Sequence, residues 1–331
     1  MKLTAKIASL GALAAVKFLG RRIPVAVRME ITNRCPNKCS YCNVWNTRAE
    51  DPSRETLFSV LGQLRDLGTR KVSFSGGEPL LREDIGEIID RCAALGISPE
   101  MNSRGTYIEK RLAGLKNLDL LKVSVDGPEE VHDALSNRAG AYRDCIKAIE
   151  AAKAAGIRVS IATTITRHNV GHLDFILGLA KRYGIRAAFQ PLKPLYRGVG
   201  GEQMKELYPA PEEYRRQVAR LAELKADGCA GYMRNSLIGL RHIQGWPDYP
   251  RLDCSAGKLF CIIDTDGTLY PCDRVSYSGK LPNCFELGVE KALNSAPPVK
   301  CGGCGFCGSL ELNFLYNFRL GTLKEVLWLL K

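Results

Sequence analysis

The sequence predicts an α/β protein in which a parallel sheet precedes a small cysteine-rich domain. Between Ile23 and Pro191, short apolar runs alternate with segments of helical period, which is the pattern of repeated strand–helix units. From Cys254 onward this alternation stops and closely spaced cysteines appear. The chain has 331 residues, of which 45% are hydrophobic and 25% charged, so it is long enough for one large and one small domain.

Six strands and the helices between them can be placed in order. The first helix has Ser53 and Thr56 near its start, and both residue types suit a helix N-terminus. Right-handed crossovers place such helices on the faces of a parallel sheet. The expected strands cover residues 25–32, 71–75, 97–103, 120–126, 157–165 and 185–191. The expected helices cover residues 53–67, 82–95, 107–113, 141–155 and 170–183.

Cys35, Cys39 and Cys42 lie within eight residues, directly after the first expected strand. One loop can wrap three thiolates around a small inorganic body, and thiolates are the ligands that iron–sulfur clusters select. A [4Fe–4S] cluster normally takes four cysteines, so this loop would leave one iron open to a ligand that is not protein. A structural zinc site or a redox CxxC pair is the alternative, although zinc sites usually combine two CxxC pairs.

Glycine and polar residues follow the second, third and fourth expected strands, at the strand ends where barrels gather their active sites. Gly76 and Gly77 would let backbone approach a ligand, and Glu78 offers a carboxylate to an ammonium group. Either this stretch or the Asp-Gly-Pro sequence after the fourth strand could instead be a plain turn. The small polar residues at the ends of the third and fourth strands are Asn102, Ser103, Ser124 and Asp126.

Three stretches resemble motifs of the radical S-adenosylmethionine (SAM) superfamily. CPNKCSYC at 35–42 is similar to its CxxxCxxC loop, with Tyr41 in the position of an aromatic residue beside the adenine. FSGGEPLL at 74–81, which includes Pro79, is similar to the stretch that receives the SAM amino group. SVDGP at 124–128 is similar to the fourth-strand motif.

A fourth stretch, HDALSNRAGAY at 132–142, resembles the HDxxRGxxGxF segment of the same family. Ser136 stands where arginine is common, and Arg138 is the expected substitute. The resemblance implies a partial (β/α)6 TIM-like barrel, which we assign to residues 23–191. By the same resemblance, the polar residues that face the methionine carboxylate or the ribose would be Asn102, Ser103, Ser124 and Asp126.

The resemblance also implies cofactors, a reaction and a partner. The cofactors would be a [4Fe–4S] cluster with an open iron and SAM bound to that iron. Reductive cleavage of SAM would give a 5′-deoxyadenosyl radical that abstracts hydrogen from a substrate. An electron donor such as flavodoxin or ferredoxin would be needed.

A second group of cysteines occupies residues 254–308. An Asp-Gly turn ending at Gly267 predicts a β-hairpin that brings Cys254 or Cys261 near Cys272. This region resembles the SPASM auxiliary-cluster region, in which a cysteine follows a glycine by five residues. The resemblance implies one auxiliary [4Fe–4S] cluster, and a zinc knuckle is the alternative. The expected ligands are Cys254 and Cys272 with two of Cys301, Cys304 and Cys307, and Cys261 is a further candidate.

Both ends of the chain are basic and apolar. Residues 1–28 carry six Lys or Arg and no acidic residue, against a formal net charge of +12 for the whole chain. Residues 1–22 are expected to form an amphipathic helix that either lies on an anionic membrane surface or caps the barrel. A signal peptide is the rival interpretation, but Lys17 interrupts its apolar run. The apolar tail, 309–331, is expected to pack on the barrel, a membrane or a greasy substrate.

Residues 192–253 show no clear period apart from one polar helix over 212–226, so a solvated linker is expected there. Their mixture of Arg and aromatic residues lacks an RNP-like or KH pattern, so no nucleic-acid partner is expected. The thirteen cysteines are better explained by clusters and reduced thiols than by disulfides, which favours the cytoplasm, with peripheral contact at the inner face of the membrane as an option.

Two substrate classes are compatible with these features. A peptide or protein substrate is favoured by the SPASM resemblance, and a lipid or isoprenoid substrate by the basic, apolar ends. Formation of a molybdopterin precursor is disfavoured, because the C-terminal cysteine spacing and terminal glycine pair of that family are absent. A non-enzymatic iron–sulfur electron carrier or a zinc-containing binding protein is the alternative to an enzyme.

Overall fold

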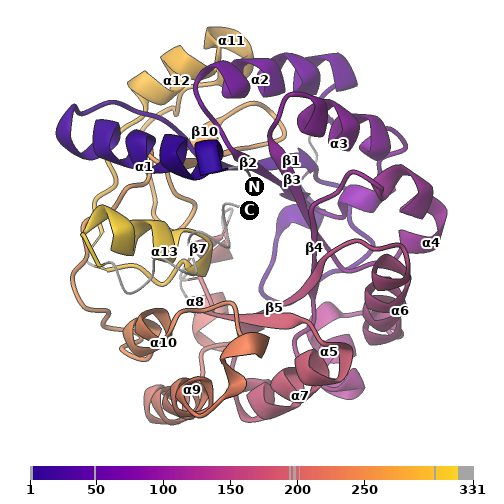
Figure 1. Cartoon of the computed structure of the whole chain (residues 1–331). Helices are drawn as coiled ribbons and strands as arrows, with labels where there is room; N and C mark the ends of the chain where they lie inside the picture. Colours follow the sequence, from indigo (N-terminus) through magenta and orange to yellow (C-terminus); the bar gives the residue numbers. More distant parts are fainter. Residues whose placement is uncertain are drawn as a thin grey trace.

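The computed structural model describes residues 3–47, 50–193, 195–196, 199–200, 202–301 and 303–319. An eight-stranded sheet in the order β10-β9-β1-β2-β3-β4-β5-β6 curls into a partial barrel, as Figure 1 shows. All neighbouring strands are parallel except β10, which is antiparallel to β9. The predicted six-stranded parallel barrel is confirmed. The strands are β1 (Ala26–Thr32), β2 (Lys71–Gly76), β3 (Ser98–Ser103), β4 (Leu120–Ser124), β5 (Val159–Ile165), β6 (Arg186–Pro191), β9 (Phe260–Ile263) and β10 (Leu269–Tyr270).

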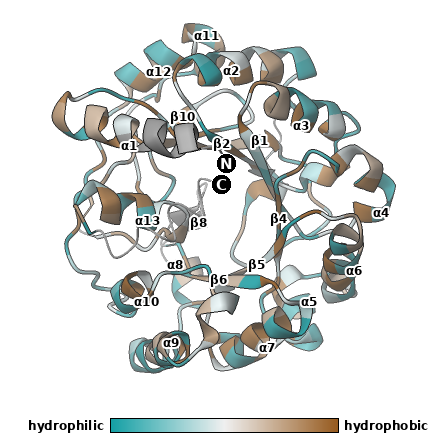
Figure 2. Cartoon of the chain, in the orientation of Figure 1, coloured by the Kyte–Doolittle hydropathy of each residue, from teal (hydrophilic) through white to brown (hydrophobic). Residues whose placement is uncertain are grey.

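The barrel helices form a ring outside the sheet (Figure 1). In the first of them Ser53 is the N-cap and accepts a hydrogen bond from the Thr56 N–H, while Leu57, Leu61 and Leu64 are buried along one face. Figure 2 shows hydrophobic and hydrophilic residues interleaved along these helices, as amphipathic helices require. The helices are α2 (Arg54–Asp66), α3 (Ile85–Ala94), α4 (Ile108–Arg111), α5 (Glu129–Ser136), α6 (Ala141–Ala154) and α7 (Leu173–Tyr183).

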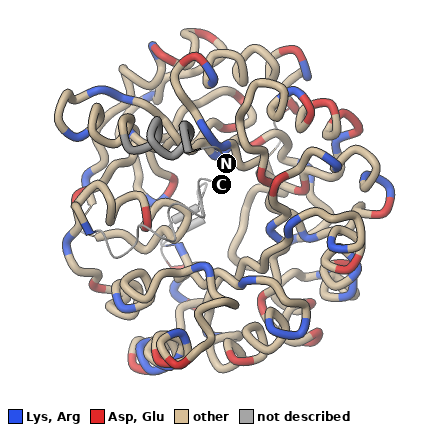
Figure 3. The backbone as a smooth tube through the Cα atoms, viewed as in Figure 1, with Lys and Arg blue, Asp and Glu red and all other residues tan. Residues whose placement is uncertain are grey.

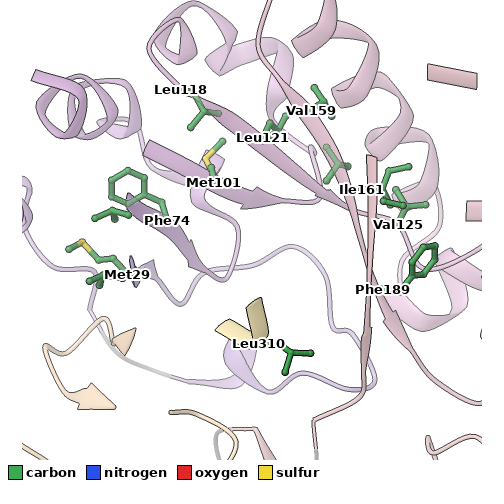
Figure 4. Close-up of a cluster of buried hydrophobic side chains, with 14 of the residues drawn as sticks. Met29, Phe74, Met101, Leu118, Leu121, Val125, Val159, Ile161, Phe189 and Leu310 are labelled. Atoms are coloured by element: carbon green, nitrogen blue, oxygen red, sulfur yellow. The ribbon is translucent and has the colours of Figure 1, made fainter. Parts of the chain in front are cut away.

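The apolar core lies between the sheet and this ring of helices. Met29, Phe74, Met101, Leu121 and Ile161 come from five successive strands, and all are fully buried (Figure 4). Burying such side chains is the main favourable contribution to folding. The sheet therefore has one apolar face, which is turned toward the helices.

The other face of the same strands is polar and faces the barrel interior. Because side chains alternate along a strand, the neighbours of the core residues point inward, and they include Ser73, Asn102, Lys122 and Ser124. These residues line a cavity of about 320 Å³. Figure 3 marks charged positions on the strands around the centre as well as on the outer helices. The interior thus holds a cavity lined by both polar and apolar residues, and not the packed apolar core of many barrels.

The cysteine-rich region extends the same sheet. β9 pairs in parallel with β1, with Ala26 opposite Phe260 and Val27 opposite Cys261. The chain returns into β10 through a turn at Gly267, whose φ of +86° favours glycine. The predicted hairpin is present. It joins the barrel sheet by pairing with β1, whereas a separate domain was expected. The helices of this region are α11 (Cys284–Leu287), α12 (Val289–Ser295) and α13 (Cys307–Tyr316).

The segment between β6 and β9 is packed against the barrel, so the prediction of a solvated linker is wrong. Asn235 Nδ2 donates to the Phe189 carbonyl at 2.8 Å, and the Phe189 N–H donates to Asn235 Oδ1 at 2.9 Å. Leu240 and Trp246 are buried nearby. These apolar residues lack a regular spacing, which hides their burial from a periodicity argument. The elements are β7 (Leu195–Tyr196), β8 (Val199–Gly200), α8 (Glu202–Lys205), α9 (Pro211–Ala226) and α10 (Leu237–Ile243).

The N-terminal helix α1 (Leu3–Phe18) packs beside α13. Val16 is buried in a cluster with Phe260, Leu312 and Tyr316, and Lys17 Nζ lies 4.1 Å from the centre of the Tyr316 ring. The part of the tail up to Tyr316 therefore packs on the barrel, while residues 320–331 lie outside the described residues. Within the described chain, no helix combines the length and apolarity that crossing a bilayer requires.

Candidate active site

The three cysteines of the first motif share one loop at the end of β1. Burial raises the pKa of Cys35 to about 11 and that of Cys42 to about 12, and like-charge repulsion from neighbouring thiolates, including Cys39, raises both further. Such thiols ionise together only when positive charge is bound among them, as a metal cluster provides. Among the described residues, no three Cys, His, Asp or Glu side chains converge closely enough to hold a single ion. Three thiols in one loop are the kind of ligand that iron–sulfur clusters take.

Backbone hydrogen bonds fasten this loop to the last turn of α5. The Lys38 N–H donates to the Ser136 carbonyl at 3.2 Å, and the Ser40 N–H donates to the Leu135 carbonyl at 3.0 Å. Carbonyls at a helix C-terminus have no partner within the helix, so they are available to the loop. The loop thus has a fixed conformation without regular secondary structure.

Arg138 supports the loop and does not line the cavity described above. Its Nε donates to Asn37 Oδ1 at 2.5 Å, and its Nη2 donates to Asp144 Oδ2 at 2.6 Å. The expected role for Arg138, a SAM contact in place of the missing arginine, finds no support in this geometry. The guanidinium of Arg138 instead forms hydrogen bonds with the side chains of Asn37 and Asp144.

Gly76 and Gly77 allow two protein segments to touch. A Cβ atom would lie 2.2 Å from the Thr32 carbonyl oxygen at Gly76, and 2.1 Å from the Arg34 carbonyl oxygen at Gly77. The Gly77 N–H donates to the Thr32 carbonyl at 2.7 Å. The close approach to the backbone that starts the cysteine loop explains why both positions need glycine, and their contact with a ligand stays a prediction.

Glu78 is buried beside the loop. Its carboxylate accepts hydrogen bonds from Ser103 Oγ at 2.7 Å, from the Arg104 N–H at 2.8 Å and from the N–H of the residue after Pro79 at 3.1 Å. Burial raises the pKa of Glu78, and these three hydrogen bonds act against that rise. A carboxylate has about four acceptor positions, so Glu78 can take one further donor near Cys35.

Tyr41 and Asp126 meet at the mouth of the cavity. The Tyr41 hydroxyl donates to Asp126 Oδ2 at 2.5 Å, and Asp126 also accepts from Arg104 Nη2 and from the Thr164 N–H, both at 3.0 Å. Asp126 is fully buried, so it is more than a turn residue. Among the residues predicted to bind the first cluster or SAM, those that line the cavity are Tyr41, Cys42, Asn102, Ser124 and Asp126.

A comparison with known families decides the identity of this site. Residues 29–179, which contain the cysteine loop and the strands that surround it, match the radical SAM superfamily. Residues 29–179 therefore carry the radical SAM domain that the sequence motifs predicted. The cofactors of radical SAM enzymes, a [4Fe–4S] cluster and SAM, fit a loop that carries three thiols within eight residues beside a buried carboxylate.

The chain is also similar to known proteins and to solved structures. The chain is 29% identical to mycofactocin maturase MftC of Mycobacterium ulcerans (strain Agy99) over 311 residues, which cover 88% of this chain and 82% of the relative. Streptococcus suis SuiB bound to S-adenosylmethionine matches with a TM-score of 0.67 and 16% identity, covering 87% of this chain and 70% of SuiB. SuiB bound to the precursor peptide SuiA matches at 15% identity with a TM-score of 0.66, covering 87% of this chain and 69% of SuiB.

A further solved structure, anSMEcpe with bound AdoMet and Cp18Cys peptide, matches with a TM-score of 0.63 and 18% identity. It covers 91% of this chain and 99% of the other. At such low identities the structural matches show a shared fold.

In the second cysteine group, four thiols interact electrostatically. The Cys254 thiol donates a hydrogen bond to Cys301, which raises the pKa of Cys254 and lowers that of Cys301. Cys272 and Cys304 lie close enough to repel the Cys254 thiolate electrostatically. Asn313 Nδ2 lies 3.5 Å from the Cys304 sulfur. These four side chains come from both sides of the hairpin and from the CxxC run.

Two other predicted ligands lie apart from this group. Cys261 stands in β9 among buried apolar residues, with Cys284 as its neighbouring thiol. Cys307 donates a hydrogen bond to the Phe189 carbonyl at 3.0 Å and lines the barrel cavity. Cys261 is therefore brought into the core, and Cys307 faces the same cavity as Tyr41.

The sequence prediction missed the charged groups that line the cavity floor. Lys122 Nζ lies 2.9 Å from Glu100 Oε2 and donates to Ser73 Oγ at 2.7 Å, and Lys71 Nζ lies 3.7 Å from Glu100 Oε1. Burial alone would raise the pKa of Glu100, but Lys122 and Lys71 hold it down to about 2. Burial lowers the pKa of Lys122 to about 8. The signal was present as charged residues at alternate positions of apolar strands.

Arg104 was also missed, although it directly follows the predicted residue Ser103. Its guanidinium lies between Tyr41 and Asp126, as its contacts with both show. The sequence signal was a basic residue at the C-terminal end of a barrel strand, the position where active-site groups gather.

We expect Glu100→Gln to lower the free energy of unfolding by about 3–5 kcal/mol near neutral pH, because it removes one partner of a buried ion pair. Anaerobic urea unfolding of the reconstituted protein measures this change, with the exposed Glu290→Gln as the control, expected to change stability by less than about 0.5 kcal/mol.

The pH dependence gives a second check on Glu100. Its pKa is lowered on folding from 4.5 to about 2, so the ionised carboxylate contributes stability above pH 4.5 that is lost as the pH falls through 2. The difference between the natural protein and Glu100→Gln should therefore shrink with acidification. A difference below about 1 kcal/mol at neutral pH would show that the floor charges are not coupled in this way.

Proposed function

We propose that this radical SAM enzyme abstracts a hydrogen atom from a residue of a peptide or protein substrate. The observation that carries the proposal is that residues next to both cysteine groups line one cavity. Tyr41 and Cys42 form part of its wall, and Phe306 and Cys307, next to the second group, form another part. A substrate group held there could reach both redox centres.

The relatives support a peptide as the substrate. They include a mycofactocin maturase, SuiB bound to a precursor peptide and anSMEcpe bound to a peptide. The cavity volume of about 320 Å³ is at the small end for ligand pockets. Such a chamber suits one side chain of a peptide, with the rest of the peptide outside it.

We propose Cys35, Cys39 and Cys42 as the ligands of the first [4Fe–4S] cluster, with SAM on its open iron. With an electron delivered by an external donor such as flavodoxin or ferredoxin, these cofactors would supply the radical that abstracts hydrogen. The protein holds SAM and excludes water. Glu78 would accept the SAM ammonium with its remaining acceptor position. The residues proposed to meet the other polar groups of SAM are Tyr41, Asn102, Ser103, Ser124 and Asp126.

We propose one auxiliary [4Fe–4S] cluster held by Cys254, Cys272, Cys301 and Cys304. The electrostatic coupling among these thiols supports this choice, and their number matches the four ligands that such a cluster normally takes. Their region, 254–308, would form the auxiliary part of the enzyme. An electron could pass between this cluster and a substrate in the cavity.

We expect the reconstituted enzyme to bind about eight irons, since two four-iron clusters are proposed. Replacing Cys35, Cys39 and Cys42 together with Ala should abolish 5′-deoxyadenosine formation and leave about four irons. Cys261→Ala, the matched control, should keep all the iron because its side chain is buried in the core. Anaerobic reconstitution, iron analysis and chromatography of 5′-deoxyadenosine measure these outcomes.

Two results would contradict these assignments. SAM cleavage by the triple variant would reject the catalytic site. One zinc with about four irons in the natural protein would show that the second cysteine group builds a structural zinc site.

A peptide substrate should raise 5′-deoxyadenosine formation above the level without substrate. SAM would lie against β3 and β4, which carry its proposed contacts Asn102 and Ser124. We therefore expect Ala188→Phe, on β6, to remove this stimulation while leaving substrate-free SAM cleavage, because the phenyl ring would take the space beside β6. Ala154→Phe, at an exposed position of α6, is the control and should keep the stimulation. The assay uses small precursor peptides encoded beside the gene and, in parallel, isoprenoid lipids. Stimulation by lipids alone would reject the peptide proposal.

The end of α1 supports a second proposal, that the enzyme binds anionic membrane surfaces. Phe18, Leu19 and Phe318 are 70%, 72% and 59% exposed, and the rings of Phe18 and Phe318 lie 5.9 Å apart. Lys17 and Arg21 flank this apolar patch, and Figure 3 shows basic positions around this end of α1. Exposed aromatic residues beside basic residues suit the interface of an anionic bilayer. A lipid substrate rests on this patch alone.

Replacing Phe18, Leu19 and Phe318 together with Ser should release the enzyme from anionic vesicles without changing its iron content. A substitution is preferable to deletion of residues 1–20, because Val16 is buried. Vesicle sedimentation measures binding, which salt should weaken, since each Lys or Arg near an anionic surface contributes about 1 kcal/mol. Phe175→Ser, at an exposed aromatic residue elsewhere, is the control. Failure of the natural protein to bind vesicles at low salt would assign the patch to a protein partner.

A further inference from the structure

We propose that Arg104 has two roles at the first cluster: its buried guanidinium fixes the conformation of the cysteine loop, and its charge favours reduction of the cluster. The inference rests on the proposed cluster site at Cys35, Cys39 and Cys42. Arg104 touches neither a substrate nor a reacting atom, so we describe it as a positioning residue.

The side chain of Arg104 leaves the end of β3 and reaches three other elements. Nη2 donates to the Tyr41 hydroxyl at 2.6 Å and to Asp126 Oδ2 at 3.0 Å. Nη1 donates to Ser136 Oγ at 2.6 Å and lies 3.0 Å from His132 Nε2. The residue is only 8% exposed. A planar guanidinium with donors in fixed directions holds such partners in one arrangement.

Two of these partners connect the cysteine loop to its support. Tyr41 belongs to the loop, and Ser136 ends α5, where its carbonyl accepts the Lys38 N–H of the same loop. Arg104 therefore bridges the loop and the helix turn that anchors it. Without the guanidinium, the Tyr41 hydroxyl would keep Asp126 as its partner but would lose its link to Ser136.

The backbone of Arg104 is held as firmly as its side chain. Its N–H donates to Glu78 Oε2 at 2.8 Å, and its carbonyl accepts the Cys145 thiol at 3.3 Å. Because both ends of the residue are fixed, the guanidinium has little freedom to follow a moving loop. The loop is instead held in the position that the barrel strands define.

The charge of Arg104 acts directly on the proposed ligands. Its guanidinium Nη2 lies 2.6 Å from the hydroxyl of Tyr41, which stands between Cys39 and Cys42 in the cysteine loop. His132 adds no second positive charge, since burial and Arg104 together lower its pKa to about 2. Charges interact more strongly in the protein interior than in water. Since reduction adds negative charge to a cluster, a buried cation nearby raises its reduction potential.

The residue at position 136 makes this arrangement sterically feasible. Ser136 is fully buried and in direct contact with the guanidinium. A long basic side chain at this position would compete with Arg104 for the same space. In this chain the cation beside the loop comes from β3, and α5 contributes a small hydroxyl acceptor.

The test is an EPR-monitored redox titration of the reconstituted full-length enzyme with dithionite as the electron source. The signal of the first cluster is identified by its change on addition of SAM. We expect Arg104→Gln to shift its midpoint potential to a more negative value, and Arg104→Lys to restore most of the shift. Arg143→Gln is the control for the loss of a positive charge, because Arg143 is exposed on α6 in an ion pair with Glu129 and does not contact the loop.

A double variant separates charge from position. Arg104→Gln with Asp126→Asn removes one positive and one negative charge, so its potential should return toward that of the natural enzyme. A fully loaded Arg104→Gln enzyme with an unchanged potential would overturn the electrostatic role.

Loss of the first cluster from Arg104→Gln but not from Arg104→Lys would support a need for the charge. Loss from both, together with earlier thermal unfolding, would make the residue merely structural and overturn the proposal. If the natural enzyme binds no iron at this loop, the proposed function fails first, and that outcome is seen before any variant is compared.

Discussion

The parallel pairing of β1 on both of its edges is the constraint on which the rest of the structure depends. β1 pairs with β2 over residues 26–32 and with β9 over residues 26–29. The cysteine loop begins where β1 ends, and the hairpin of the second cysteine group begins at β9. One strand therefore fixes both cysteine groups relative to the cavity, because ladder hydrogen bonds allow no continuous sliding and a one-residue shift would turn every side chain over.

Charge is concentrated inside the barrel, where it is costly to bury. Asp273, directly after Cys272, accepts hydrogen bonds from Arg28 of β1 and from Lys193 after β6. Burial disfavours its ionised form, but Arg28 and Lys193 hold the pKa of Asp273 well below its usual value. Such groups stabilise a fold less than apolar packing of the same volume would. Their role is to hold elements in place, because they join β1, the end of β6 and the region of the second cysteine group in one wall around the cavity.

The sequence was sufficient for the features that depend on local pattern. Six strands, the cysteine loop and the Asp-Gly hairpin each carry their signal within about ten residues, as apolar alternation, thiol spacing or turn chemistry. Tyr41 and Asp126 followed from resemblance to a family whose motifs are equally local. These parts of the fold and site could be predicted because short segments determine them.

The remaining features depend on contacts between distant segments. Gly76 and Gly77 are needed because they touch the backbone of Thr32 and Arg34, more than forty residues earlier. The local sequence does not show this contact, so the prediction considered only a ligand. Cys261 shares the sequence context of Cys272 but lies in a strand whose register turns it toward the core. Asn235 forms hydrogen bonds with the backbone of β6, although it belongs to a segment without a regular spacing of apolar residues. No local pattern contains this information, because the barrel must close before any of these contacts exists.

The same long-range contacts link the choice of substrate to the second cysteine group. Phe306, Cys307 and Gly308 line the cavity, and α13, which starts at Cys307, also carries Asn313. Asn313 holds both the Cys304 sulfur and the Ser255 N–H, next to Cys254. A change in α13 that reshapes the cavity would therefore also move the thiols of the second cysteine group. The shape of the cavity, and therefore the substrate that it can hold, cannot change far without a change in the positions of these thiols.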